Sequence, residues 1–373
     1  YAIVYAYDED YVTQDYRLLK SEDGAATWDD ITDPAWISDP IAVATDGVDG
    51  DFLAVAFAGL TVYISDDGGA TFEAVSGTHG ITEIYELEVS PEVADARDIA
   101  MGGVGGIARS TVSGGTPGGW IDADSDPAYT GWADGVVVDI KFTPSWGEDR
   151  TILVATATDT SVYLQCGTWG MSPGWNEDSI MGIAAVAVVG PATVPSVDDV
   201  PWGTLRGATA GISTPLDYSG RNSDKRYAWV NVNYNDTTGP VGKIFRVKNK
   251  SVMEVNQQIE GLPWLTNVSY VGYIAQGKAI AGVLGSGDAD EGGHPVLAEC
   301  CEGVQVFGND GVAQMDICCI FWDEACKPPT GRHAMAAFYV SADKAYAVAL
   351  GPDADYDESA WSVSFDDGDT WNQ

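Results

Sequence analysis

The chain has 373 residues, is 45% apolar, and carries 18 basic against 56 acidic side chains, for a formal charge of −38. Because binding to phosphates needs an excess of positive charge, this balance argues against a nucleic-acid partner. No apolar run approaches the roughly 18 residues of a membrane-spanning helix, so none is expected. So large a charge resists compaction unless cations screen it, which favours a salty environment or bound divalent ions; a well-solvated acidic surface is the alternative.

Short segments of alternating hydrophobicity, separated by turn residues, predict antiparallel strands along the chain and almost no helix. The first group lacks an innermost strand and has three strands, whereas the next three groups have four each. The predicted strands are 2–7, 16–20 and 27–30; then 41–45, 52–58, 61–65 and 71–75; then 84–89, 98–102, 107–111 and 120–122; then 136–142, 151–157, 161–165 and a segment near Trp175.

The remaining strands form three further groups, two of them with insertions. The fifth group is predicted at 183–189, 227–232, 243–248 and 251–255, with an insertion at about 192–225. The sixth is predicted at 268–274, 278–284, 296–300 and 304–307, followed by an insertion at about 308–331, and the seventh at 335–341, 345–349, 360–364 and 370–372. The chain is therefore expected to form one domain of about seven small sheets. Closing a ring of such sheets needs the missing strand, so we expect further residues beyond 373.

A short turn sequence occurs three times, at 21–28, 65–72 and 364–371, with the pattern S-x-D-x-G-x-T-[WF] and Ala25 in place of Gly in the first copy. The Asp carboxylate can accept backbone N–H bonds within the turn, and Gly supplies a positive φ. These turns resemble the Asp-box, or BNR repeat, of sialidase-like β-propellers. The resemblance implies an all-β propeller of about seven four-stranded antiparallel blades, the first incomplete, in which each box joins the third and fourth strands and is structural. The residues that carry it are Asp23, Trp28, Asp67, Phe72, Asp366 and Trp371.

Closely spaced carboxylates are the clearest functional signal. Ca²⁺ takes about 6–8 oxygen ligands, which alternate loop positions can supply, although no complete EF-hand loop is present. Segments 8–10, 288–291 and 353–358 fall between second and third strands, and 122–126 joins two blades, so all are expected on the face opposite the Asp-boxes. We expect an acidic sector that binds Ca²⁺, or else a hydrated acidic rim. The predicted ligands are Asp122, Asp124, Asp126, Asp288, Asp290, Asp353, Asp355 and Asp357.

Six cysteines in an acidic chain that we expect to be secreted favour disulfides, with fifteen pairings open. We expect the two vicinal pairs, 300–301 and 318–319, to be cross-linked, which would tie the second insertion to the sixth blade. Zinc is the alternative, and the lack of a C-x-x-C spacing stands against it. The predicted disulfide residues are Cys166, Cys300, Cys301, Cys318, Cys319 and Cys326.

Two further patterns concern the surface. Sequons at Asn235, Asn249 and Asn267 are predicted glycosylation sites and hint at an extracellular location. Residues 221–250 form a basic segment that could dock on the acidic surface of another copy or be one ordinary hairpin face. It contains seven of the 18 basic residues: Arg221, Lys225, Arg226, Lys243, Arg246, Lys248 and Lys250.

Evidence for catalysis is weak. The sialidase resemblance implies an N-terminal arginine signature, but Arg17 is the only arginine in the first 96 residues and lies in a strand leading to an Asp-box. With 56 acidic residues, counting leaves a carboxylate pair for glycoside hydrolysis open, because the test is a carboxyl separation of roughly 5–10 Å across a cleft. The histidines, His79, His294 and His333, are scattered and are expected to be structural. Exposed tryptophans could stack on sugars, but most are expected to fill gaps between blades; the candidates are Trp132, Trp146, Trp169, Trp175 and Trp202.

These observations predict an extracellular or cell-surface propeller that acts as a structural or interaction module, such as a subunit of a cell-surface layer or filament. Its expected partners are further copies or other surface proteins, with glycans as a further candidate; Ca²⁺ is the candidate cofactor, and no catalytic residue is assigned. The alternative is a carbohydrate-active propeller, either a glycoside hydrolase or a sugar-binding module.

Overall fold

The computed structural model describes most of the chain, and every structural statement below concerns the described residues. These are residues 1–7, 14–33, 35–36, 38–48, 50–126, 130–158, 161–170, 174–176, 186–189, 210–236, 239–254, 264–274, 278–284, 304–308, 321–324, 333–341, 343–350, 359–366 and 371. No helix among them is long and apolar enough to cross a bilayer.

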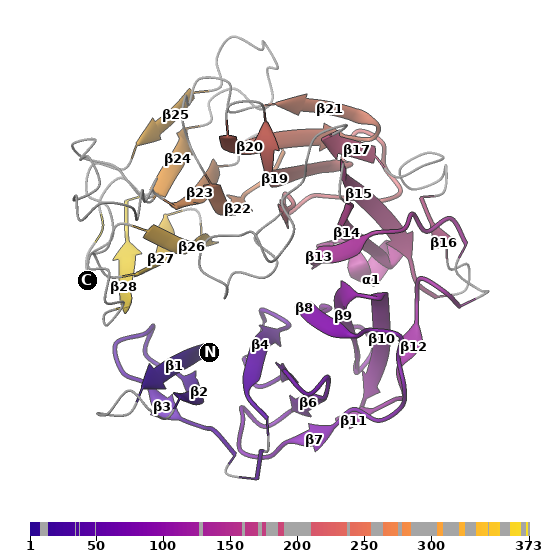
Figure 1. The fold of residues 1–373 in the computed structure, drawn as a ribbon, viewed down its shortest axis with the longest axis vertical. Helices are drawn as coiled ribbons and strands as arrows, with labels where there is room; N and C mark the ends of the chain where they lie inside the picture. Colours follow the sequence, from indigo (N-terminus) through magenta and orange to yellow (C-terminus); the bar gives the residue numbers. More distant parts are fainter. Residues whose placement is uncertain are drawn as a thin grey trace.

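Seven antiparallel sheets surround one axis, each built from consecutive strands with the first strand innermost (Figure 1). The first sheet contains β1 (Ala2–Tyr7), β2 (Gln14–Lys20) and β3 (Asp29–Asp30). The second contains β4 (Pro40–Thr45), β5 (Leu53–Phe57), β6 (Val62–Ser65) and β7 (Glu73–Ala74). The third contains β8 (Glu83–Val89), β9 (Ala96–Val104) and β10 (Gly106–Ser113), with β11 (Thr116–Pro117) and β12 (Ile121–Asp122) both paired to β10.

The later sheets follow the same order around the ring. The fourth contains β13 (Val136–Phe142), β14 (Thr151–Thr158) and β15 (Ser161–Thr168), with β16 (Gly174–Trp175) and β17 (Val186–Val189) on β15 and the one-turn helix α1 (Trp146–Asp149) between β13 and β14. The fifth contains β18 (Ala210–Ser213), β19 (Tyr227–Asp236), β20 (Gly239–Lys248) and β21 (Ser251–Glu254). The sixth contains β22 (Trp264–Val271), β23 (Lys278–Leu284), β24 (Val304–Gly308) and β25 (Phe321–Glu324). The seventh contains β26 (His333–Ser341), β27 (Lys344–Leu350) and β28 (Ser359–Ser364).

The described residues therefore form an all-β propeller of seven sheets, as predicted. The first copy of the repeated turn joins β2 to β3, and the second joins β6 to β7. Strands β1–β3 thus correspond to β5–β7, and the first blade has no counterpart of β4 among the described residues. The predicted incomplete first blade is confirmed.

Two strand predictions were wrong. Segment 183–189 was expected to begin the fifth blade, but β17 pairs with β15 in the fourth sheet, and the fifth sheet begins with β18 inside the predicted first insertion. Residues 304–307 were expected to be the fourth strand of the sixth blade, but β24 is its third strand, and β25, inside the predicted second insertion, is its fourth. Each missed strand, β18 or β25, has only four residues, and its pairing with a neighbouring strand rather than a long local run defines it. Residues 190–209 and 296–300 lie outside the described residues.

The core lies between neighbouring blades. Because each blade is covered on both faces, inner strands can be apolar along their whole length, and all five residues of β5 are buried. Between the second and third blades, Phe52, Ile64 and Leu87 join one apolar cluster. Each fully buried side chain of this size contributes roughly 1.5–3 kcal/mol relative to an exposed one.

The tryptophans in this part of the ring fill gaps between blades. Trp146, Trp169 and Trp175 are buried, and Trp132 is partly buried with its ring centroid 4.6 Å from that of Trp175. These positions favour a packing role over the predicted alternative of sugar stacking. Trp202 lies outside the described residues.

Candidate functional site

The repeated turns use their polar side chains internally. In the second copy, Asp67 Oδ1 accepts the backbone N–H of Thr71 at 2.9 Å, while Asp67 Oδ2 accepts the Thr71 hydroxyl at 2.7 Å. The Ser65 hydroxyl donates to Asp67 Oδ1 at 2.8 Å and accepts the Gly69 N–H at 2.8 Å. The turn thus closes on itself through one carboxylate and one hydroxyl.

The same bonds recur in the first copy, where Asp23 accepts the Thr27 N–H at 2.8 Å and the Thr27 hydroxyl at 2.7 Å. In the third copy, the Ser364 hydroxyl donates to Asp366 at 2.9 Å. Hydrogen bonds from the turn threonines lower the pKa of Asp23 and that of Asp67 to about 2. Carboxylates held this way stay ionised and are poorly suited to proton transfer at neutral pH.

The repeated turns share one face of the propeller with the loops that join first and second strands. In an antiparallel meander, the first and third strands end on the same side, so both kinds of connection emerge together. The Gly68 N–H in the second repeated turn donates to the carbonyl of Asp51 in such a loop at 2.8 Å. We call this side of the molecule the turn face.

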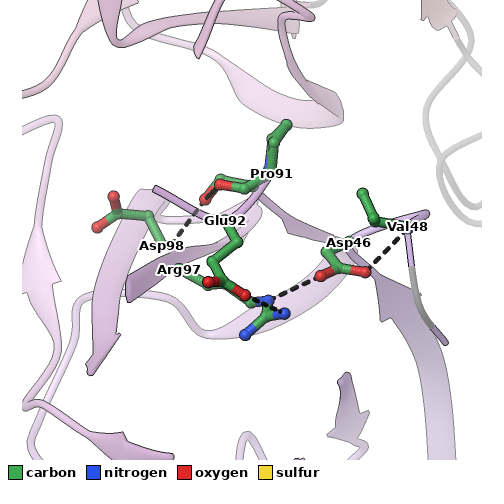
Figure 2. Close-up of polar contacts among 7 residues, drawn as sticks. Asp46, Val48, Pro91, Glu92, Arg97 and Asp98 are labelled. Atoms are coloured by element: carbon green, nitrogen blue, oxygen red, sulfur yellow. Dashed lines mark hydrogen bonds and ion pairs between the residues drawn. The ribbon is translucent and has the colours of Figure 1, made fainter. Parts of the chain in front are cut away.

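An ion network joins the second and third blades on the turn face, and Figure 2 shows its members. Arg97 Nε lies 2.7 Å from Asp46 Oδ2, and Arg97 Nη2 lies 2.7 Å from Glu92 Oε2. The Asp46 side chain is fully buried, and its other oxygen accepts the Val48 N–H at 3.0 Å. The Arg97 guanidinium also stacks over the Phe52 ring, 4.9 Å from its centroid. This network holds the loops of the second and third blades together, and its role is structural.

Comparable polar links join later blades. Asp149 Oδ2 accepts the Gly220 N–H at 2.8 Å between the fourth and fifth blades. Asp217 Oδ1 accepts the Ile274 N–H at 2.9 Å between the fifth and sixth. These bonds satisfy backbone groups at loop and strand edges that would otherwise lack partners.

A second group of charged residues lies on the innermost strands β8 and β13, which border the propeller axis (Figure 1). Lys141 Nζ lies 2.7 Å from Glu88 Oε1, and both side chains retain partial exposure. Asp139 accepts the Ile140 N–H at 2.8 Å and also the Ile212 N–H of the fifth blade. Glu86 completes this group, which we call the axial cluster: Glu86, Glu88, Asp139 and Lys141.

The axial cluster has the most perturbed carboxylates outside the turns. Burial raises the pKa of Asp139 to about 7, with the Glu88 charge adding to the rise and Lys141 opposing it. Burial, followed by the charges of Asp139 and Glu88, raises the pKa of Glu86 well above its usual range. The charge of Glu88 raises the pKa of Lys141. Perturbed carboxyls of this kind are functional-site candidates, because they hold protons near neutral pH.

Sequence reasoning did not find the axial cluster. The available signal was the alternation of charged with apolar residues in EIYELEV at 83–89 and VVVDIKF at 136–142. Charged residues at alternate positions of an inward-facing strand indicate polar side chains near the axis. Only the structure brings the two segments together.

The predicted metal ligands are partly described. Asp122 ends β12, and Asp124 and Asp126 follow it, with Asp124 beside the turn at Gly106 on the face opposite the repeated turns, as expected. Asp122 Oδ1 accepts the Gly80 N–H at 2.8 Å. Within the described ranges, no group of three or more His, Cys, Asp or Glu side chains is arranged to hold a metal. The other predicted ligands, Asp288, Asp290, Asp353, Asp355 and Asp357, lie outside the described residues, as do the acidic residues at 8–10.

The disulfide prediction was wrong for Cys166, which is a buried free thiol. Its side chain joins the apolar cluster between the fourth and fifth blades, where Tyr218 is a neighbour. Burial raises the pKa of this thiol and also that of the Tyr218 hydroxyl. The remaining cysteines, Cys300, Cys301, Cys318, Cys319 and Cys326, lie outside the described residues.

The three sequon asparagines occupy different positions. Asn267 bridges two inner strands, because its Nδ2 donates to the Ala337 carbonyl at 2.7 Å and its Oδ1 accepts the Ala337 N–H at 2.9 Å. Asn249 Nδ2 donates to the Ser223 carbonyl at 3.0 Å in the turn between β20 and β21. Asn235 lies near the end of β19. Glycosylation stays a prediction, and the side-chain amides of Asn249 and Asn267 have structural partners.

Comparisons with known proteins find similar solved structures but assign the chain to no family. No protein-family model matches the chain. No curated protein sequence matches it. Similar solved structures include YCF48 from Cyanidioschyzon merolae (12% identity, TM-score 0.49, covering 90% of this chain and 85% of that one) and YCF48 bound to D1 peptide (13%, 0.49, 90% and 80%). Sqt1 from Saccharomyces cerevisiae is also similar (9%, 0.47, 95% and 77%). Similarity at this level carries no argument about what this chain binds or does, and the propeller architecture rests on its own seven sheets.

Proposed function

We propose that the chain is an Asp-box propeller that acts as an extracellular structural or interaction module, in the manner of a subunit of a cell-surface layer or filament. One observation carries this proposal. The repeated turns commit their Ser, Asp and Thr side chains to bonds within the turn, while large apolar side chains stay exposed on the same face. Exposed apolar side chains gathered on one face are typical of surfaces that contact other proteins.

The inner strands support a scaffold role as well. Ser213 Oγ accepts the Tyr270 N–H at 2.8 Å, and Ser269 Oγ accepts the Tyr339 N–H at 3.1 Å, in both cases across neighbouring blades. With Asn267, these side chains complete the hydrogen bonding of inner-strand edges. Their polar groups are therefore used in holding blades together.

Calcium belongs to the same proposal. Burial raises the pKa of Asp124, and the charge of Asp122 adds to that rise, so a cation beside this pair would relieve unfavourable charge. We expect millimolar Ca²⁺ to raise the thermal unfolding temperature of the wild type more than that of a variant with Asp122→Asn, Asp124→Asn and Asp126→Asn. Mg²⁺ serves as the control ion.

A carbohydrate-active propeller is the second candidate, and the axial cluster is the observation that favours it. Glycoside hydrolysis needs one carboxyl that stays protonated near neutral pH beside another that is ionised. Asp139 and Glu86, with their raised pKa values, meet the first requirement. Release of reducing ends from a polysaccharide panel, abolished in Asp139→Asn, would support this candidate.

Association of the wild type tests the proposal itself. In millimolar Ca²⁺, sedimentation velocity should detect species larger than the monomer, and thermal stability should rise. A protein that stays monomeric with unchanged stability would contradict the proposal. Polysaccharide hydrolysis under the same conditions would favour the second candidate.

A further inference from the structure

The turn face carries most of the exposed large apolar side chains in the described part of the chain. Val48, Leu216 and Tyr273 are 78%, 57% and 60% exposed and lie in loops between first and second strands. Val340 and Phe365 are also exposed on this face, at the end of β26 and in the third repeated turn. Such residues lower the free energy of association when a partner covers them.

A basic patch lies on the turn face of the fifth and sixth blades. The loop at 214–226 is tied to the turn at 249–250, because Asn249 Nδ2 donates to the Ser223 carbonyl at 3.0 Å. The Leu216 N–H donates to the Gly272 carbonyl at 2.8 Å, which places Leu216 close to the loop that carries Tyr273. The loop also contains Asp224 and Asp217, whose Oδ2 lies 3.7 Å from Lys225 Nζ, and the basic residues Arg221, Lys225, Arg226 and Lys250 outnumber these two carboxylates. We define the basic patch as Leu216, Arg221, Lys225, Lys250 and Tyr273, of which Arg221, Lys225 and Lys250 are the exposed cations.

An acidic patch lies on the same face over the second and third blades. Asp66 leans against Gly115, where an added Cβ would lie 2.2 Å from Asp66 Oδ2. The Gly114 N–H donates to the Asp95 carbonyl at 3.1 Å, so Asp66 and Asp95 flank one turn. Asp51 shares its loop with Val48 and bonds to the second repeated turn through its carbonyl. We define the acidic patch as Val48, Asp51, Asp66 and Asp95, all of which are exposed.

The two patches lie on opposite sides of the ring. In Figure 1, the fifth blade (β18–β21) and the second blade (β4–β7) are separated by the propeller axis. A two-fold axis in the plane of the ring, with two copies facing each other, would place each basic patch on the partner's acidic patch. Such an interface is self-complementary, because every contact occurs twice.

We infer that two copies of this chain associate face to face through their turn faces, with the basic patch of each on the acidic patch of the other. A second copy is the occupant that fits, because each patch presents exposed apolar surface, Leu216 and Tyr273 in one and Val48 in the other, and carries charges opposite to those of the other patch. The rest of the chain is strongly acidic, so the basic patch determines how the second copy is oriented in the dimer. This inference rests on the proposed function as an interaction module and names the surface and the partner.

Complementary charge reversal tests the interface. One variant carries Arg221→Glu with Lys250→Glu, and the other carries Asp66→Lys with Asp95→Lys. Each variant alone places like charges at both contacts and should raise the dimer dissociation constant at least about tenfold. An equimolar mixture of the two should restore association to near the wild-type value, because both contacts then pair opposite charges. Sedimentation equilibrium at near-physiological salt measures all four samples.

The mixed sample also controls for changes in net charge and for misfolding of either variant. Its summed net charge equals that of two wild-type chains, and a misfolded variant could not be rescued by mixing. If either double variant fails to unfold cooperatively, the single pair Lys250→Glu and Asp66→Lys replaces it. If both charge-reversed variants associate as tightly as the wild type, the inference is overturned. It is also overturned if mixing the two variants does not restore association. Either result leaves the proposed function intact. A wild type that is monomeric at all concentrations overturns the inference, and the Ca²⁺ and polysaccharide assays then decide the proposed function separately.

Discussion

Ala25 is the residue at which the repeated turn departs from its own pattern. It adopts φ 74°, and the glycine at the same place in the second copy, Gly69, adopts φ 91°. A left-handed conformation strains a residue with a Cβ, and glycine adopts it freely. The first turn therefore forms despite a local cost.

Replacing Ala25 with glycine should stabilise the protein. We expect Ala25→Gly to raise the free energy of unfolding by about 0.5–1 kcal/mol, since the relief of strain exceeds the extra chain entropy of glycine. Ala26→Gly is the matched control, because Ala26 has no positive φ and should gain nothing. Denaturant unfolding of both variants measures the difference, and equal gains would contradict the explanation.

The ionisation of Asp67 contributes to the pH dependence of the protein's stability. Its folded pKa of about 2 lies below the ordinary value of 3.8, so the carboxylate contributes stability above pH 4 that is lost as pH falls toward 2. Asp67→Asn should unfold more easily than the wild type at pH 7, because an amide cannot accept both Thr71 bonds. The free energies of unfolding of the two proteins should converge as pH approaches 2. A stability difference that is constant with pH in thermal unfolding would rule out this role of the charge.

At the scale of elements, the loops of neighbouring blades are held by buried polar bonds. Arg97→Ala would leave the fully buried Asp46 carboxylate without its ionic partner. We expect a loss of about 3 kcal/mol in the free energy of unfolding, typical of breaking one side of a buried pair. Arg17→Ala is the control, because Arg17 and Asp30 form an exposed pair that should contribute less than about 1 kcal/mol. Equal losses in denaturant unfolding would show that the Arg97 network is no stronger than a surface pair.

Elements with strong local signals could be predicted from the sequence. Strand β5 is a continuous apolar run, and β6 leads into a turn whose Ser and Asp mark it clearly. Strands β18 and β25, with four residues each, were missed because register with a neighbouring strand, rather than local sequence, defines them. The same limit hid the axial cluster, since Glu88 and Lys141 are 53 positions apart and meet only when the third and fourth blades pack.

At the scale of the whole molecule, charge is distributed by face. The predicted basic segment proved to be split between the turn face, where Arg221, Lys225 and Lys250 are exposed, and β20, where Arg246 is buried between blades. Composition predicted an acidic particle but could not predict that basic and acidic patches share one face on opposite sides of the ring. That arrangement depends on the order of seven blades around the axis.

Hydrogen–deuterium exchange of the wild type, compared between dilute and concentrated solutions, tests most directly whether the turn face is the contact surface. We predict that concentrating the protein slows exchange in the loops at 46–51, 114–115, 214–226 and 249–250, while the opposite face near Asp122 is unchanged. Slowed exchange confined to the opposite face, or no change at any concentration, would contradict this account.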